Sequence, residues 1–169
     1  MPRSLNLGVE VEGLPSYFAR LRSLPKVAQD EMREAAMAIA EDEASRIRAA
    51  AASDSSQSAA IAQFIKARRD RVPAISAGGA RRAGVKGGAR AGEIFFGAEF
   101  GGKARKAGPV KTRTARSGFV IKETTQQFRP HTGHEGYFFF PTLRKDQDRM
   151  LERYEQALTN VEREWARGE

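Results

Sequence analysis

Hydrophobic and polar residues alternate near the start of the sequence and then change to a helical spacing. Between residues 5 and 11 every second side chain is apolar, which predicts a β-strand with one buried face. From residue 14 to residue 24 apolar side chains recur three and four positions apart, which predicts an amphipathic helix packed on that strand. Pro25 interrupts this spacing, and because proline lacks the N–H that a helix interior needs, we expect a kink or a new helix near it.

Two long helices are expected further along the chain. Residues 26–52 are rich in Ala, Glu, Met and Arg, which are strong helix formers. Residues 141–165 carry the clearest helical pattern, with apolar side chains on one face and mixed charges on the other. The simplest interpretation packs the two apolar faces together, and a coiled-coil contact of the second helix with a partner is the alternative. The predicted faces are Val27, Met32, Ala36, Ile39, Ala40 and Ile47, and Leu143, Met150, Leu151, Tyr154, Leu158, Val161 and Trp165.

The region between these helices predicts shorter elements. A Ser-rich loop at residues 53–58 supplies N-cap oxygens for a helix over about residues 56–69. Residues 72–75 and 119–121 are candidate strands. Residues 93–101, EIFFGAEFG, form an aromatic cluster that ends in glycine, and we expect Ile94, Phe95 and Phe96 to be buried.

Together these patterns predict an α+β fold in a single domain over residues 1–169. A small β-sheet packs against the long N-terminal helix and the long C-terminal helix. Gly-rich and basic stretches at about residues 76–92 and 102–117 are expected to form an extended, flexible loop or arm. The expected core consists of Leu7, Val9, Leu21, Met32, Ile39, Phe64, Phe96, Leu151, Tyr154 and Leu158.

Positive charge is concentrated in one part of the chain. Residues 66–116 contain fourteen Lys and Arg against three acids, a local balance of +11, whereas the whole chain carries +8. Such a block indicates a polyanionic neighbour or an acidic protein surface, and a solvated loop is the alternative. Because residues 103–117 contain no aromatic side chain for base stacking, phosphate or carboxylate contacts are expected. The candidate contacts are Arg81, Arg82, Lys86, Lys103, Arg105, Lys106, Lys111, Arg113 and Arg116.

The composition excludes several classes of protein. The chain has no Cys, so disulfides, thiolate chemistry and Cys-ligated zinc are excluded. No run of about 18 apolar residues could span a bilayer, and the first residues lack the apolar region of a signal peptide. We therefore expect a soluble protein that is not secreted by that route.

Residues 127–144, QFRPHTGHEGYFFFPTLR, gather both histidines and a run of aromatic side chains. Tyr137 is followed by phenylalanine at positions 138–140, and so much apolar area on a surface marks an interaction site. Pro141 suits the first turn of a helix, where its missing N–H is not needed. We interpret this segment as an aromatic anchor, fused to a helix start, that the domain presents to a partner.

Two motifs resemble nucleotide or metal sites only in part. Glycines at positions 79 and 84 have the spacing of a phosphate-binding loop, but Val85 stands where the lysine is required and no Ser or Thr follows. His131 and His134 are three residues apart, not the four of a helical zinc site, and Gly133 between them breaks a helix. Capping or orienting the aromatic segment is the simpler role for this pair.

Covalent catalysis has no better support. No nucleophile-elbow motif is present, and the carboxylates at positions 41–43 are expected on a solvated helix face. We predict that the protein is not an enzyme and needs no cofactor or metal. A metal-dependent hydrolase that uses the two histidines is the alternative within the enzyme class.

Two separated pieces of the sequence resemble one known family. The opening VEGLPSYFARLRSLP, residues 11–25, is similar to the start of the head-tail joining proteins (neck or tail-completion proteins) of long-tailed double-stranded DNA phages. The second piece is GAEFG, residues 97–101, followed after a basic loop by the aromatic segment. It resembles the family's Glu-Phe-Gly element and the aromatic stretch that leads through proline into the C-terminal helix.

This resemblance implies an α+β subunit that is made in the host cytoplasm and becomes part of the virion at the head-tail junction. There it would assemble into a ring, commonly a hexamer, with portal, adaptor, stopper and tail-tube proteins around the DNA channel and without a membrane. The implied structural or subunit-contact residues are Glu99, Phe100, Gly101, Arg129, Pro130, Tyr137, Phe138 and Pro141. Phe139 and Phe140 complete the aromatic run and join them in the predicted interface.

Under this hypothesis the basic segment faces DNA or an acidic ring partner. Phosphate contacts of this kind position a nucleic acid without reading its sequence. The competing hypothesis is a sequence-independent DNA-binding protein that uses residues 66–116. It explains the charge equally well but leaves the aromatic segment without a role.

Overall fold

The computed structural model describes residues 25–69, 73–84, 88–102, 112–114, 120–122 and 128–168. The strand and helix expected within the first 24 residues lie outside the described residues. The same holds for six of the predicted basic contacts, which are Lys86, Lys103, Arg105, Lys106, Lys111 and Arg116.

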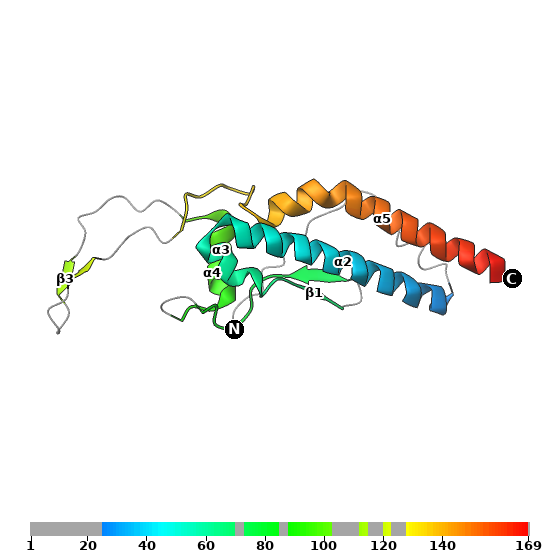
Figure 1. The fold of residues 1–169 in the computed structure, drawn as a ribbon, viewed down its shortest axis with the longest axis horizontal. Helices are drawn as coiled ribbons and strands as arrows, with labels where there is room; N and C mark the ends of the chain where they lie inside the picture. Colours follow the sequence, from blue (N-terminus) through cyan, green and yellow to red (C-terminus); the bar gives the residue numbers. More distant parts are fainter. Residues whose placement is uncertain are drawn as a thin grey trace. The chain divides into compact units, whose positions relative to one another are not determined.

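Two long helices and two small antiparallel sheets make an α+β fold (Figure 1). Helix α2 (Lys26–Asp54) and helix α5 (Phe139–Gly168) match the two long helices that the sequence predicts. The sheets are two-stranded and consist of β1 (Lys66–Arg68) with β2 (Ala74–Ser76), and β3 (Thr112–Thr114) with β4 (Val120–Lys122). The predicted fold class is therefore confirmed.

Local capping explains where the first two helices begin. Pro25 directly precedes α2, and its carbonyl accepts a hydrogen bond from Gln29 N at 3.0 Å. Helix α3 (Ser56–Ala62) begins after Ser55, whose hydroxyl accepts a hydrogen bond from Ser58 N at 3.1 Å. A serine oxygen in this position satisfies one of the N–H groups that a helix start leaves without a partner. The expected capping by serine is confirmed, but the expected loop over residues 53–58 is wrong, because α2 extends to Asp54 and α3 begins at Ser56.

The helix expected over residues 56–69 is too long, because α3 ends at Ala62. A tight turn follows, in which Ile65 N donates to Ala62 O at 3.1 Å. The Arg48 guanidinium from α2 donates to Ile65 O at 3.0 Å and thereby holds this turn in place. The next three residues then pair with β2 instead of continuing the helix. Tertiary contacts here override a sequence of strong helix formers.

Part of the Gly-rich stretch forms a hydrogen-bonded hairpin. Ala83 N donates to Ala89 O at 3.0 Å and Ala91 N donates to Arg81 O at 2.9 Å, on either side of the bridged pair Arg82 and Arg90. We call residues 79–84 and 88–92 the arginine hairpin. The predicted flexibility of residues 76–92 stays a prediction, but the described part has regular backbone pairing.

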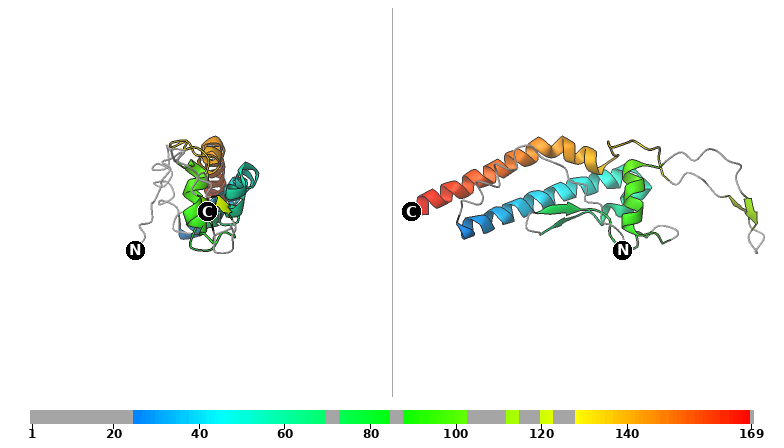
Figure 2. Two further views of the ribbon diagram at one scale, coloured as in Figure 1. Left: turned by 90° about the vertical axis from the view of Figure 1, so that its left-hand side faces the viewer. Right: turned by 180° about the vertical axis from the view of Figure 1, so that it is seen from behind.

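Helix α4 (Ala91–Phe100) follows the arginine hairpin and contacts α3 (Figure 2). Its sequence is the aromatic cluster AGEIFFGAEF. It ends at Gly101, which has a φ of 75° and donates its N–H to Gly97 O at 3.0 Å. Glycine is the residue that adopts this left-handed conformation at low cost.

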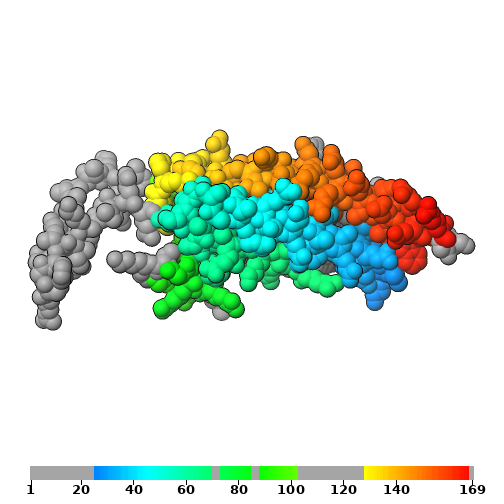
Figure 3. All heavy atoms as spheres, viewed as in Figure 1, coloured from blue at the N-terminus to red at the C-terminus, as the bar shows by residue number. Residues whose placement is uncertain are grey.

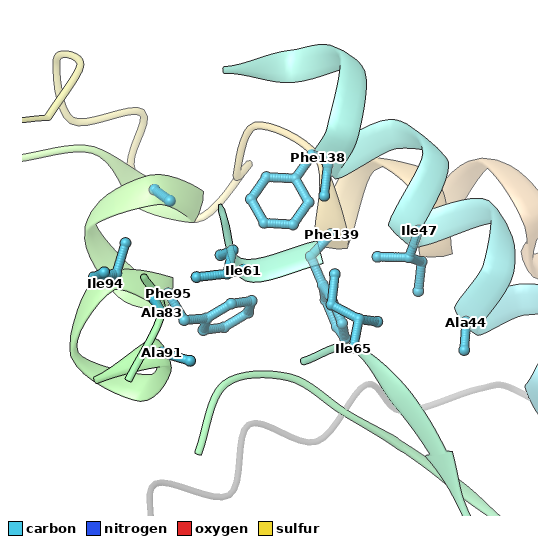
Figure 4. Packing of buried hydrophobic residues seen from close by; sticks show 12 residues of the cluster. Ala44, Ile47, Ile61, Ile65, Ala83, Ala91, Ile94, Phe95, Phe138 and Phe139 are labelled. Carbon is cyan, nitrogen blue, oxygen red and sulfur yellow. The ribbon is translucent and has the colours of Figure 1, made fainter. Parts of the chain in front are cut away.

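The chain divides into two compact units, residues 40–146 and residues 1–39 with 147–169. The core of the first unit contains side chains from α2, α3, α4 and the start of α5 (Figure 4). Its buried members are Ala44, Ile47, Ala51, Ile61, Ile65, Ala83, Ala91, Ile94, Phe95, Ala98, Phe138 and Phe139.

The second unit has a smaller core between two helix segments. Ala28 and Met32 of α2 pack with Leu158 and Val161 of α5, and in Figure 3 the blue atoms of α2 and the red atoms of α5 lie against each other. Tyr154 packs at the edge of this cluster, and burial raises the pKa of its hydroxyl above the usual value. The simplest sequence interpretation, in which the two apolar stripes form a core, is confirmed for these residues.

Some burial predictions were wrong. Val27 is 58% exposed and Phe96 is 41% exposed, although both were expected on buried faces. Phe64, Leu151 and Tyr154 are only half-buried, whereas Met32, Ile39 and Leu158 are buried as predicted. No helix among the described residues is both long and apolar enough to cross a membrane.

Candidate functional site

GAEFG and the described part of the aromatic segment, residues 128–144, meet at a buried carboxylate. Glu99, on the last turn of α4, has no exposed surface. Its Oε2 accepts hydrogen bonds from Phe138 N at 3.2 Å and Phe139 N at 2.9 Å, and its Oε1 accepts one from Phe140 N at 3.0 Å. A single side chain therefore caps the start of α5 from about 40 residues earlier in the sequence.

This cap leaves no N–H group at the start of α5 without an acceptor. The first four N–H groups of a helix have no partner within it, and in α5 three of them bind Glu99. The fourth position is Pro141, which has no N–H. The first bond within the helix follows directly, from Thr142 N to Phe138 O at 3.3 Å. A negative charge here also interacts favourably with the helix dipole.

Glycine at position 136 makes room for this carboxylate. Gly136 has a φ of 75°, and a Cβ atom there would overlap Oε1 of Glu99. Gly101 is constrained in a similar way, because a Cβ there would overlap the carbonyl oxygen of Pro130. Both glycines permit a close approach that any other residue would prevent. We call Glu99, Gly136 and residues 138–141 the Glu99 cap.

Arg129 ties the same segment to two helices. Its guanidinium makes a two-pronged ion pair with Asp54 at the end of α2, with N–O distances of 2.9 and 2.5 Å. It also donates to Ala98 O at 3.4 Å and lies 3.5 Å above the centre of the Tyr137 ring. The planar guanidinium suits such combined carboxylate and aromatic contact.

Backbone pairing completes the connection between the two pieces. Gly102 N donates to Arg129 O at 2.8 Å, and Thr132 N donates to Phe100 O at 3.0 Å. The Tyr137 hydroxyl donates to Pro130 O at 2.7 Å. All the positions matched by the resemblance in these two pieces thus contribute to one continuous set of contacts.

The two histidines belong to the loop before α5 and make contacts with neighbouring segments. His131 Nδ1 is 2.8 Å from Phe100 O, and the His134 carbonyl accepts a hydrogen bond from Arg144 at 2.7 Å. Among the described residues no group of three His, Cys, Asp or Glu side chains could hold a metal ion. These contacts agree with the interpretation that the two residues orient the loop.

The aromatic anchor was expected to be exposed, and for two of its rings this is wrong. Phe138 is 2% exposed and Phe139 is 7% exposed, and Figure 4 shows both pointing into the core near Ile61. The physical reason is the Glu99 cap, because its hydrogen bonds hold the backbone of both residues inside the protein. Burying the rings there also keeps water away from the capped N–H groups.

Aromatic surface nevertheless remains beside the cap. Phe96 stacks on Phe100 with 6.4 Å between ring centres, and Phe100 lies 5.5 Å from Phe140. Phe96 is exposed, and Phe100 and Phe140 are half-buried. We call these three residues the aromatic stripe. Of the rings predicted to contact a partner, only Phe100, Phe140 and the half-buried Tyr137 keep accessible surface.

One prediction about carboxylates was also wrong. Residues 41–43 were expected on a solvated face, but Glu43 is fully buried. Asp42 pairs with Arg46 at 3.5 Å, as an exposed helix pair would.

Sequence reasoning missed three parts of the site. Asp54 was assigned to a Ser-rich loop, and Gly136 was not singled out. Gly97 was matched without a reason, yet a Cβ at that position would lie 2.5 Å from the Phe128 ring. The one available signal was Glu99 itself, because a lone acid near the end of an apolar helical cluster requires partners when it is buried.

Comparison with protein-family models, curated proteins and solved structures finds no match to this chain. Its candidate function therefore depends on the contacts above and on the resemblance between its motifs and those of the phage proteins.

Proposed function

We propose that this protein is a structural subunit of the head-tail connector of a tailed phage. In this role it assembles into a ring, joins the DNA-filled head to the tail and contacts neighbouring neck and tail-tube proteins. It belongs to the virion at the head-tail junction and carries out no chemical reaction.

The observation that supports this proposal most is the contact around Glu99 between the two parts of the second resembling piece, GAEFG and the aromatic segment. The short motif GAEFG and the aromatic segment are separated by 25 residues of basic sequence. They nevertheless share five side-chain hydrogen bonds and one backbone hydrogen bond. Residues that are matched as a pair in the sequence thus work as a pair in space, which a coincidental resemblance does not require.

The Glu99 cap also gives the connector role a physical basis. A subunit that transmits contacts around a ring needs a fixed relation between its surface and its long helices. The cap and the Arg129 ion pair fix the loop to α2, α4 and α5 through buried and half-buried contacts. The aromatic stripe is an accessible apolar surface beside these contacts.

The aromatic stripe is the surface we assign to subunit contact. It replaces Phe138 and Phe139 in the interface expected from the sequence, since those two rings are in the core. Aromatic side chains are enriched in interfaces, and exposed apolar groups gain most when a neighbour covers them. Phe96 is the most exposed ring of the stripe.

The test is the mass of the purified protein in solution, measured across concentration for the natural sequence and for Phe96→Ser. We expect a ring-sized species, either alone or on addition of the phage portal or tail-tube protein, and we expect the variant to shift it toward the monomer. Val27→Ser is the matched control, because Val27 is the other large apolar side chain that is exposed among the described residues.

A natural protein that stays a monomer or dimer under all these conditions would overturn the proposed function. Equal effects of Phe96→Ser and Val27→Ser would overturn the assignment of the interface to the aromatic stripe. Far-ultraviolet circular dichroism of both variants shows whether the fold is retained.

A further inference from the structure

The arginine hairpin places two positive charges directly opposite each other. Arg82 and Arg90 form an antiparallel bridge, and both side chains are exposed. Like charges in directly opposed positions repel each other, so such a pair is unfavourable in the absence of an anion. Because this pair does not stabilise the fold, we looked for a ligand that would account for it.

The backbone geometry holds both arginines on the same outer face. The hydrogen bonds from Ala83 N to Ala89 O and from Ala91 N to Arg81 O flank the pair, which makes it the close, non-hydrogen-bonded type. Ala83 and Ala91, the next residues on each strand, are buried in the core. Since neighbouring side chains on a strand point to opposite faces, Arg82 and Arg90 must point outward.

Glycine contacts at the base of the hairpin fix this geometry. Gly78 has a φ of 86°, and a Cβ there would lie 2.8 Å from Gly92 Cα. Gly92 N in turn donates to Gly79 O at 2.9 Å. Two backbones approach this closely only where side chains are absent. The glycines therefore allow the hairpin to adopt one defined backbone conformation.

No carboxylate among the described residues neutralises these arginines. Ion pairs between described residues include those of Arg33, Arg46 and Arg129, and none is found for Arg81, Arg82 or Arg90. The nearby Glu93 accepts a hydrogen bond from the backbone N–H of Arg90 at 2.9 Å. Both arginines are exposed, and the guanidinium of Arg82 lies beside Gly88 of the same hairpin.

The start of α4 does not itself provide the binding groups. Its first N–H groups already have acceptors, which are Glu93 for Arg90, Arg81 O for Ala91 and Gly79 O for Gly92. An anion at this place would have to be bound by arginine side chains, whose forked guanidinium groups match phosphate oxygens.

We propose that the arginine hairpin binds the phosphate groups of duplex nucleic acid without reading its sequence. Two guanidinium groups on one face can contact neighbouring phosphates, and the ligand's negative charge relieves their mutual repulsion. Three exposed residues near them, Gly79, Ala80 and Gly84, are small and let a phosphate backbone approach, and the exposed Arg81 adds a further positive charge. An acidic protein partner would instead be expected to meet an apolar interface core, and no large exposed apolar side chain occurs in the described part of this hairpin.

This site does not depend on the connector role. The aromatic stripe and the arginine hairpin use different residues, so either proposal can fail while the other holds. Ring formation is measured by mass and phosphate binding by the salt dependence of affinity.

The test measures binding of a short mixed-sequence duplex by fluorescence anisotropy over a series of salt concentrations. We expect Arg82→Gln/Arg90→Gln to make the slope of log affinity against log salt shallower by about 2, since about one counterion is released per phosphate contact. The control is Arg163→Gln/Arg167→Gln, which lowers the net charge equally at exposed positions of α5. This control is expected to leave the slope unchanged.

A second variant distinguishes loss of duplex binding from loss of the fold. Arg90→Glu converts the repulsive pair into an attractive one, so we expect the thermal midpoint of unfolding to rise while duplex affinity falls at least tenfold at low salt. A fall in both quantities would mean that Arg90 is needed for the fold, and it would overturn the proposal.

The remaining arms distinguish the source of the anion. Equal salt-dependence slopes for the hairpin variant and the control would mean that duplex binding depends only on the net charge of the protein, and this would overturn the proposal. Tighter binding to polyglutamate than to duplex would assign the hairpin to an acidic protein. Tighter binding to vesicles of phosphatidylserine and phosphatidylcholine would assign it to lipid headgroups, and displacement of duplex by about equal concentrations of inorganic phosphate would assign it to free phosphate.

Discussion

At the scale of single residues, the loop before α5 contains glycines that are required for different reasons. Gly133 and Gly136 both have φ near 70°, in the region that favours glycine. A Cβ at Gly133 would meet nothing within 4 Å, whereas a Cβ at Gly136 would overlap Oε1 of Glu99. The two positions therefore separate the cost of backbone conformation from the cost of disturbing the cap.

We predict that Gly136→Ala destabilises the protein by at least about 2 kcal/mol more than Gly133→Ala. Both substitutions carry the cost of a left-handed backbone, about 1–2 kcal/mol. Only Gly136→Ala also displaces the carboxylate that accepts Phe140 N, and a hydrogen bond to a charged group contributes about 1.5–3 kcal/mol. Urea unfolding of both variants measures the difference. Equal losses would mean that the carboxylate can move aside without cost.

At the scale of secondary-structure elements, the Glu99 cap joins the end of α4 to the start of α5. Helix ends that are buried need partners for their N–H groups, and here the two oxygens of one carboxylate accept three hydrogen bonds. Removing it leaves these groups without acceptors in a region from which two aromatic rings exclude water. The connection between the two helices is therefore a main determinant of stability.

We predict a loss of about 3–5 kcal/mol for Glu99→Ala and a smaller loss, about 1–3 kcal/mol, for Glu99→Gln. Glutamine keeps one acceptor oxygen but loses the negative charge that interacts with the helix dipole. Denaturant unfolding followed by circular dichroism at 222 nm gives both values.

The control lies on the same helix. Glu93 is exposed and caps a single N–H, that of Arg90, so Glu93→Ala should cost only about 1 kcal/mol. If Glu99→Ala cost no more than this, the three hydrogen bonds would contribute little net stability and the cap would not be a main determinant.

The elements also show which features the sequence can predict. Helices α2 and α5 follow from continuous local signals, namely Pro25 before the first and a long apolar stripe in the second. Residues 66–68 were misassigned because Lys, Ala and Arg favour helices, while the Arg48 contact to Ile65 that ends α3 comes from another element. Local propensity has no information about such contacts.

The candidate site was predicted in part for a similar reason. The aromatic run was visible from its composition, and Glu99 entered the prediction only through the family resemblance. Their contact joins residues 39 to 41 positions apart, so neither the cap nor the burial of Phe138 follows from any local spacing. The need for glycine at position 136 became clear only with Glu99 beside it.

At the scale of the whole molecule, the two proposed surfaces make separate demands on the protein. The aromatic stripe requires a neighbour that covers Phe96, and the arginine hairpin requires an anion between Arg82 and Arg90. A ring would bring several hairpins together, and linked binding sites bind a long ligand more tightly than single sites do. Assembly should therefore strengthen binding of a long duplex, and the duplex should in turn favour assembly, whereas without duplex the arginines should have no effect on assembly.

We predict that Phe96→Ser lowers both the mass of the assembly and its affinity for a long duplex, because separated subunits lose this multivalent binding. Arg82→Gln/Arg90→Gln should lower duplex affinity and leave the mass of the ring unchanged in the absence of duplex. Mass photometry and anisotropy on the same samples give both readouts. If the arginine variant also dissociated the ring, we would infer that the hairpin contacts an acidic neighbouring subunit. The positive charge of the hairpin would then contribute to subunit assembly and not to DNA binding.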